Sequence, residues 1–468
     1  MKRLKTLIST ALLLTSLTFA ENSAPHFASG VKVGEVDQDS ALVWVRLTKN
    51  EKADFSLLPI FTEGLSMDVK DKSGTEMPTE VVPGLKGQAR IIYHVKDHSQ
   101  KIESPWATIH SNRNFTHQFQ LKNLHSNSTY LYTIEAKTNN SKASRSIKGS
   151  FKTAPSKNDP SEIRFVVTTC QAIRSVDSGP EGHVVYKNML NFKPNFFVHT
   201  GDILYYDKSP LCVNKEQAES KWDLMFGYQH NKNFHLNVTS YFMKDDHDTL
   251  KNDCWPGQTY HDLTFDQGLK IFKENVPMGD KTYRTFRWGK DVQIWLTENR
   301  DYRSPNNMKD GPDKTILGKE QKAWLKSTIQ SSDAKYKFII TPGPIVGPDK
   351  KGKKDNHANA VFYHEGQELR NFIRDQENTY VICGDRHWQY LSVDPKTKIL
   401  EMGCGPINDQ HGFGGNSGEI KEFHKYFSGL GGFLGITVKN GKAKAQWFSA
   451  VELDPKTNIP KVRYTEKL

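Results

Sequence analysis

Segment 195–206 constrains the fold more than any other stretch, because it joins an apolar run to a polar turn. It reads Asn-Phe-Phe-Val-His-Thr-Gly-Asp-Ile-Leu-Tyr-Tyr. Such a run, bounded here by Pro194 and Gly201, is typical of a buried parallel strand. In an open α/β sheet, ligands bind beyond the carboxyl ends of the strands, so Asp202 is expected at that edge. Taken alone, the segment is explained better by an ordinary strand followed by a Gly-Asp turn.

The same pattern recurs at three other predicted strands, which also end in residue types that bind metals. These residues are Cys170 after strand 164–168, Asp245 to Asp248 after strand 238–243, and Asp385 with His387 after strand 380–383. Cys170 by itself is better explained as a buried structural thiol. The Asp-Asp-His-Asp run is harder to explain without a ligand, because its carboxylates repel one another and stay ionised most readily around a cation. A solvated acidic turn is the alternative.

These residue types also indicate which metals to expect. Aspartate and histidine are ligands for hard or borderline ions, and a shared carboxylate can bridge two of them. A thiolate from Cys170 and a phenolate from Tyr205 stabilise an oxidised metal, which favours a ferric ion at this edge of the sheet.

The chain has 468 residues, enough for two or three domains. Residues 1–20 have the basic start, apolar middle and small-residue end of a Sec-type signal peptide, which predicts a periplasmic or secreted protein. Without this segment the formal net charge falls from +11 to +8. That modest excess suits an anionic substrate, and no nucleic-acid-binding module accompanies it. We expect a monomer with no membrane anchor, since no later segment is long and apolar enough to span a bilayer.

Two structural parts are predicted on either side of a polar linker at 155–160. Residues 25–155 have strand patterns throughout, and 124–136 resembles a fibronectin type III strand pair with a corner tyrosine. Residues 161–468 alternate short apolar strands with helical patterns, as in layered α/β domains. Besides the strands named above, we expect strands at 196–199, 292–297, 337–341 and 399–402, and helices at 183–191, 216–226, 264–276, 319–331 and 366–376.

Four motifs, taken in order, resemble those of the PhoD-like alkaline phosphatases, a family of calcineurin-like metallophosphoesterases. They are Thr169-Cys170-Gln171, Gly201 to Tyr205, Lys244 to Asp248, and Gly384 to His387. Segments 27–31, 39–47, 299–303 and 317–325 are also similar, so the resemblance covers nearly the whole mature chain. It implies an α/β fold: a layered α/β/α metallophosphoesterase sandwich, preceded by a fibronectin type III-like β-sandwich.

The resemblance also implies an activity: an exported phosphoester hydrolase in which a metal-bound hydroxide attacks phosphorus. The implied cofactors are Fe(3+) and Ca(2+), bridged by Asp202. The implied metal-binding set is Cys170, Asp202, Tyr205, Asp246, Asn252, Asp385 and His387. His247 would contact the substrate phosphoryl group. Arg300 would either clamp the phosphate or serve as a structural ion-pair partner.

Two residues depart from the family pattern. Lys244 stands where the family usually has Trp, and Glu298 stands where the strand before Arg300 usually ends in Asp. Lys244 would change the wall of the pocket or its charge. Glu298 need not make the contact that Asp makes at this position in the family.

Several alternatives stay open at this point. A phosphodiesterase acting on lipid, teichoic-acid-like or nucleotide diesters fits the same motifs, and an inert exported binding protein is a further possibility. Five cysteines leave an odd thiol in an oxidising compartment. A disulfide between Cys212 and Cys254 is expected from their polar loops, with two separate buried thiols as the alternative.

Overall fold

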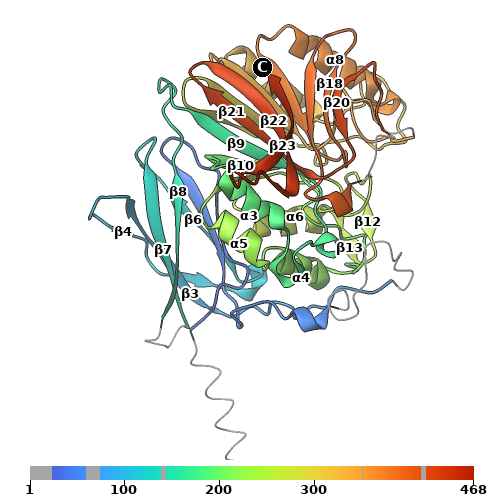
Figure 1. Cartoon of the computed structure of the whole chain (residues 1–468). Helices are drawn as coiled ribbons and strands as arrows, with labels where there is room; N and C mark the ends of the chain where they lie inside the picture. The colour runs from blue at the N-terminus through green and yellow to red at the C-terminus, as the bar shows by residue number, and fades with distance from the viewer. Residues whose placement is uncertain (1–23, 59–73, 139–143, 350–351, 413–417) are drawn as a thin grey trace, which may run out of the picture.

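The computed structural model describes residues 24–58, 74–138, 144–349, 352–412 and 418–468, so the expected signal peptide lies outside the described residues (Figure 1). The described chain folds into a β-sandwich followed by a larger part built on two sheets. Among these residues, no helix has both the length and the apolar character needed to cross a membrane.

The N-terminal part consists of two antiparallel sheets that enclose an apolar core. One sheet contains β1 (Val31–Gly34), β2 (Ala41–Arg46) and β6 (Thr116–Leu121); the other contains β3 (Gly87–Val95), β4 (Ile102–Glu103), β5 (Ala107–Ile109), β7 (Thr129–Lys137) and β8 (Arg145–Lys152). Every second residue of β7 is buried, as expected for a strand with one face on a core. The Tyr130 hydroxyl accepts a hydrogen bond of 2.8 Å from the backbone N–H of His125. This contact suits a tyrosine corner; the fibronectin type III assignment stays a prediction.

The larger part contains a six-stranded and a seven-stranded sheet. In spatial order the first has β11 (Thr239–Phe242), β10 (Phe196–His199), β9 (Ile163–Thr168), β21 (Gly432–Lys439), β22 (Lys442–Leu453) and β23 (Pro460–Lys467). The second has β14 (Arg284–Trp288), β15 (Val292–Leu296), β16 (Tyr336–Thr341), β17 (Thr379–Cys383), β19 (Leu400–Cys404), β18 (Gln389–Val393) and β20 (His424–Ser428). Strands β9 to β11 are parallel, and so are β15, β16, β17 and β19.

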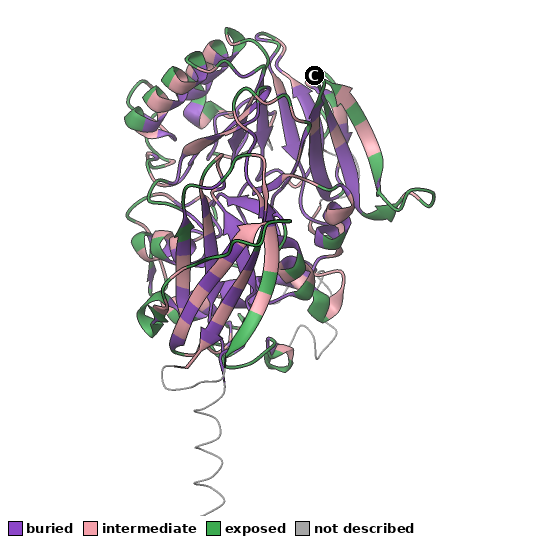
Figure 2. Ribbon diagram, turned by 90° about the vertical axis from the view of Figure 1, so that its left-hand side faces the viewer, coloured by how far each residue is buried: buried purple, intermediate pink, exposed green. Residues whose placement is uncertain are grey.

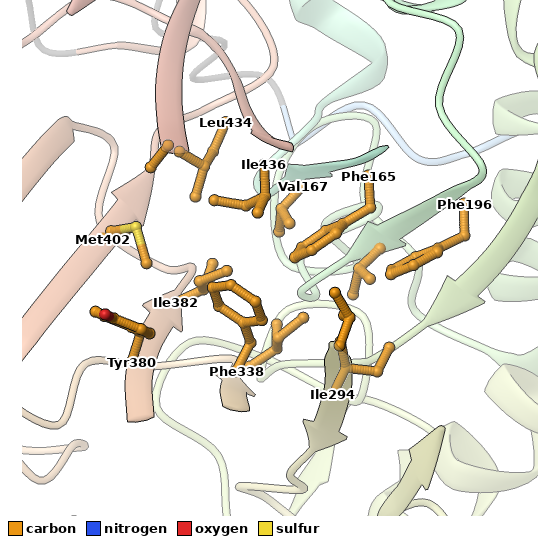
Figure 3. Close-up of a cluster of buried hydrophobic side chains, with 14 of the residues drawn as sticks. Phe165, Val167, Phe196, Ile294, Phe338, Tyr380, Ile382, Met402, Leu434 and Ile436 are labelled. Carbon is orange, nitrogen blue, oxygen red and sulfur yellow. The ribbon is translucent and has the colours of Figure 1, made fainter. Parts of the chain in front are cut away.

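The two sheets pack face to face around the main core (Figure 3). Phe165 of the first sheet lies edge-on to Phe338 of the second, with ring centroids 5.3 Å apart. Apolar clusters join α3 (Val184–Asn191) and α5 (Gln229–His235) to the outer face of the first sheet, and α7 (Gly318–Gln330) and α8 (Tyr363–Arg374) to that of the second. Two sheets therefore lie between the helices, where the α/β/α expectation has one. Strand patterns alone do not say which sheet a strand joins.

Most of the predicted elements are present, with small shifts at their ends. The strand 196–199 has the predicted bounds, and α8 begins three residues before the predicted start at 366. The strands are mostly buried, whereas the helices expose one side (Figure 2). The remaining α-helices and strands lie in or beside a second core that borders the site: α4 (Lys215–Met225), α6 (Phe265–Asn275), β12 (Thr259–Tyr260) and β13 (Leu263–Thr264).

Buried polar contacts fasten the sandwich to the larger part. Arg46 of β2 forms an ion pair of 2.8 Å with Asp223 of α4, and both side chains are at most 4% exposed. Asn114 also donates to Asp223, and the Trp44 indole donates to the Glu274 carbonyl at 2.7 Å. Removing one partner of a buried ion pair is strongly destabilising, so these contacts hold the two parts in a fixed arrangement.

Glu365 of α8 joins three segments on the outer side of the second sheet. Its carboxylate accepts hydrogen bonds from the Ile316 backbone N–H at 2.5 Å, from the His357 ring at 3.0 Å, and from the Thr315 hydroxyl. Burial raises the pKa of this carboxyl, but the hydrogen bonds from His357 and Thr315 outweigh burial and bring the pKa down to about 2.

Glu365→Gln is expected to lower the free energy of unfolding at pH 7 by about 3 kcal/mol, since each pKa unit corresponds to about 1.4 kcal/mol. Because the folded pKa is depressed, the stabilisation is complete above the ordinary value of 4.5 and is lost as pH falls through about 2. The free energies of unfolding of the variant and the parent should therefore approach each other as pH falls, which urea unfolding at pH 7, 5 and 3 measures. Glu368→Gln, on the same helix but 34% exposed, is the control and should cost less than about 1 kcal/mol. Equal losses in the two variants would contradict the assignment.

Candidate metal centre

The candidate site lies where strands of both sheets end. Cys170 follows β9, Asp202 follows β10 and Asp246 follows β11, all in the first sheet, whereas Asp385 follows β17 in the second. The parallel pairing of β9, β10 and β11 puts their carboxyl ends at one edge. The four strand ends predicted from the sequence therefore meet in one place.

Three of these residues share an unusual backbone conformation just beyond the strand. Cys170, Asp202 and Asp385 have φ angles of 49°, 55° and 57°. Residues other than glycine rarely adopt this left-handed region, and such outliers cluster at functional sites. Gly201 has a φ of 107°, and a Cβ there would lie 2.6 Å from the backbone nitrogen of Asp245. Only glycine allows the turns after β10 and β11 to approach this closely.

The ligand-type atoms form four groups in which all atoms lie within 4.8 Å of one another. The groups are Cys170–Asp202–His387, Asp202–Asp246–His247, Asp202–Asp245–Asp385 and Asp246–Asp253–Asp355. Asp202 belongs to three of the four, which is the arrangement expected of a carboxylate that joins two neighbouring cation sites.

Cys170 and Tyr205 are hydrogen-bonded to the same oxygen of Asp202. The thiol lies 3.4 Å and the phenol 3.2 Å from Oδ2, and the phenol is also 3.4 Å from Nε2 of His387. Burial, reinforced by neighbouring carboxylates, raises the pKa of Cys170, Tyr205 and Asp202 well above their ordinary values. Their ionised forms therefore need a nearby positive charge.

The four residues of the Asp-Asp-His-Asp run do different things. Asp245 accepts a hydrogen bond of 2.5 Å from Arg300, while Asp248 accepts the backbone N–H groups of Asp245 and Ile203. Asp246 lies in two of the ligand groups. His247 bonds to Asp207 through Nδ1 at 2.6 Å. Asp248 is therefore a structural carboxylate, whereas the side chains of the other three residues of the run border the site.

The structure shows the contacts of two further expected site residues, Asn252 and Arg300. Asn252 is exposed and uses its backbone N–H to bond Asp207, while the next residue, Asp253, joins the fourth ligand group. Asn252 as a ligand stays a prediction, and the turn brings the neighbouring Asp253 side chain into a ligand group. Arg300 is buried in ion pairs with Asp245 and Asp355, as the structural alternative for this residue anticipates.

The expected disulfide between Cys212 and Cys254 is absent from the described structure. Both cysteines are free and fully buried in the second core. The Cys212 thiol donates to the carbonyl of Gln217, and the Cys254 thiol donates to that of Asp246, both at 3.5 Å. Each sulfur therefore has its own partner within an apolar environment, and the alternative of two separate thiols is correct here.

Five residues of the site were not predicted as site residues: Asp207, Asp253, Lys353, Asp355 and His411. His411 lies 2.9 Å from the Tyr205 hydroxyl, and its ring centroid is 4.4 Å from that of His387. Asp207 is five residues beyond Asp202 in the same loop. Lys353 and Asp355 lie in the loop after β16, and the carboxyl end of β16 is at the same edge as the site. A search of every segment that follows a predicted parallel strand would therefore have included these two residues.

The two departures from the family pattern contact each other. The Lys244 ammonium lies 2.8 Å from Glu298 and 2.6 Å from Asp301, with no part of the lysine side chain exposed. Burial lowers the pKa of Lys244, but Asp301 and Glu298 outweigh burial and raise it. Lys244 therefore lies in the wall behind the site as a charged group, paired within the protein.

Residues 165–429 match the family described as PhoD-like phosphatase, and residues 14–155 match the N-terminal domain of the same family. The chain belongs to the PhoD-like phosphatases. Alkaline phosphatase D of Bacillus subtilis is 23% identical, with 92% of this chain and 79% of that protein covered.

Solved structures agree with the fold of this PhoD-like phosphatase. A structure of PhoD has a TM-score of 0.72 at 19% identity, covering 94% of this chain and 89% of that one. A purple acid phosphatase from yellow lupin seeds has a TM-score of 0.62 at 12% identity, covering 95% and 74%. With the clustered ligand residues, family membership makes this chain a metal-dependent phosphoester hydrolase.

Proposed function

We propose that this PhoD-like phosphatase is exported and hydrolyses phosphate monoesters at a centre of two or more cations joined by Asp202. The observation that carries the proposal is the place of Asp202 in three ligand groups at the meeting point of the strand ends. Export is supported by the sequence of residues 1–20.

The residues fit bound cations. The Oδ1 atom of Asp202 and the Oδ2 atom of Asp245 are buried with no hydrogen-bond partner among the described residues, which is costly unless an ion completes the site. The thiol, phenol and imidazole of Cys170, Tyr205 and His387 suit Fe(3+), and the oxygen-rich side at Asp246 and Asp385 suits Ca(2+). Bound cations would neutralise the phosphoryl oxygens and ease the ionisation of water.

The residues of the chain hold and orient the reacting groups. Asp207 fixes the His247 ring through Nδ1, which leaves Nε2 to donate to a phosphoryl oxygen. Burial lowers the pKa of His247, but Asp246, Asp207 and Asp202 outweigh burial and raise it to about 10. In its charged form, with both ring nitrogens protonated, His247 can donate to Asp207 and to a phosphoryl oxygen together. Arg300 holds Asp245 and Asp355 in place.

Metal analysis and an ester panel test the proposal together. Purified protein should contain iron and calcium, and with calcium supplied it should release phosphate from p-nitrophenyl phosphate above pH 7. Cys170→Ala should lose iron while keeping the fold. Protein free of both metals, or inactive toward every phosphoester, would point to the inert binding protein. Faster cleavage of bis(p-nitrophenyl) phosphate than of the monoester would favour the phosphodiesterase.

A further inference from the structure

Lys353 is a cationic side chain at the rim of the candidate metal centre. Its ammonium lies 2.9 Å from Oδ1 of Asp253 and 3.7 Å from Oδ2 of Asp355. Those two carboxylates form one ligand group with Asp246, and Asp246 also belongs to a group that contains Asp202. The positive charge of Lys353 therefore lies beside the ligand groups.

Exposure separates Lys353 from Arg300, the cation that the sequence suggested for phosphate binding. The Arg300 side chain is 2% exposed and forms ion pairs with three carboxylates, those of Asp245, Asp246 and Asp355. The Lys353 side chain is 20% exposed. Lys353 is thus the less buried of the two cations, whereas Arg300 is enclosed by carboxylates.

The backbone forms hydrogen bonds on both sides of Lys353 along the chain. Before it, the Glu401 carboxylate accepts the backbone N–H groups of Ile345, Val346 and Gly347 at 2.7 to 2.8 Å. After it, the Arg303 guanidinium donates to the carbonyl of Asp355 at 3.0 Å. Lys353 therefore extends from a backbone that is anchored two residues away at Asp355, and its ammonium is held by Asp253 and Asp355.

We propose that Lys353 binds a non-bridging oxygen of the substrate phosphoryl group and gives the centre a preference for monoesters over diesters. An ammonium has three N–H donors, so Lys353 can hold Asp253 and a phosphoryl oxygen together. A monoester at alkaline pH carries two negative charges and a diester carries one, so a cation beside the phosphoryl group favours the monoester. This inference rests on the proposed function of the same site.

Lys353→Met tests the inference, with Lys354→Met as the matched control. Lys354 is the next residue, is exposed, and loses the same charge when substituted. We expect Lys353→Met to reduce kcat/KM for p-nitrophenyl phosphate by about 10- to 100-fold, the effect of one charged hydrogen bond. The diester value should fall by less than about threefold. Lys353→Arg, which keeps the charge, should retain most of the preference for monoesters.

Phosphate binding and metal content make the outcome decisive. In calorimetry on the metal-loaded proteins, Lys353→Met should weaken inorganic phosphate binding by a similar factor, with iron and calcium content unchanged. A parallel fall for both esters, a loss of metal, or identical behaviour of Lys353→Met and Lys354→Met would overturn the inference. If the parent protein hydrolyses neither ester, the proposed function fails instead, and the calorimetry still decides whether Lys353 binds phosphate.

Discussion

Asp202→Asn is expected to reduce kcat/KM for a phosphate monoester by about a thousandfold and to remove most of the bound metal. Asp202 lies in three of the four ligand groups, and one of its buried oxygens lacks a partner among the described residues. The amide keeps the shape of the side chain but removes the charge that neighbouring cations would share. Metal stabilisation of the transition state supplies several kcal/mol, and about 4 kcal/mol corresponds to a thousandfold in rate.

Inductively coupled plasma analysis and steady-state kinetics on the same preparation measure both effects. Asp291→Asn is a suitable control, because Asp291 is also buried but precedes the amino end of β15, away from the strand ends that form the site. Thermal unfolding should show that Asp202→Asn stays folded. Full metal content in a folded but inactive Asp202→Asn protein would exclude Asp202 as a metal bridge.

His247→Gln is expected to lower kcat/KM by about 10²- to 10³-fold, the effect of losing one donor to transition-state charge. Asp207→Asn should cost less, about 10- to 100-fold, because it leaves the ring in place but removes its orienting carboxylate. Asp207 also helps to raise the pKa of His247 to about 10. Without it that pKa falls, so His247 loses its proton at lower pH and the alkaline limb of the kcat/KM profile moves to lower pH.

Profiles from pH 6 to 11 for the parent and both variants measure these effects. His247→Gln should show no alkaline limb from this ring at all. An alkaline limb that stays at the parental pH in Asp207→Asn would mean that another group causes it, and the proposed donor role of His247 would fail.

The strand ends were predictable because short apolar runs give buried strands, and their carboxyl ends must meet at one edge. In the segment 196–202, the apolar run 196–199 predicts the strand, and Gly201 and Asp202 mark its carboxyl end. Asp246, which follows β11, is found by the same rule. For these residues, local pattern and tertiary position agree.

Other features depend on tertiary contacts that no local pattern encodes. Strand β21 pairs antiparallel with β9, and β22 and β23 continue the sheet from it, so the last three strands of the chain join the first sheet. Helix α5 has a polar sequence whose buried side, including Phe234, becomes clear only against α3 and the sheet. In the turn that follows Asp248, the side chain of Asp253 joins a ligand group, and the sequence does not distinguish it from its neighbour Asn252. Asp355 reaches the site from the loop after β16.

The contact between Lys244, Glu298 and Asp301 has a consequence for chimeras between this chain and its relatives. A hybrid that takes Trp at 244 from a relative but keeps residues 297–301 would leave the buried Glu298 carboxylate and the partly buried Asp301 carboxylate close together without a counter-ion. Breaking a buried ion pair in this way costs about 3–5 kcal/mol. A chimera that keeps this ion pair therefore has to exchange the turns after β11 and β15 together.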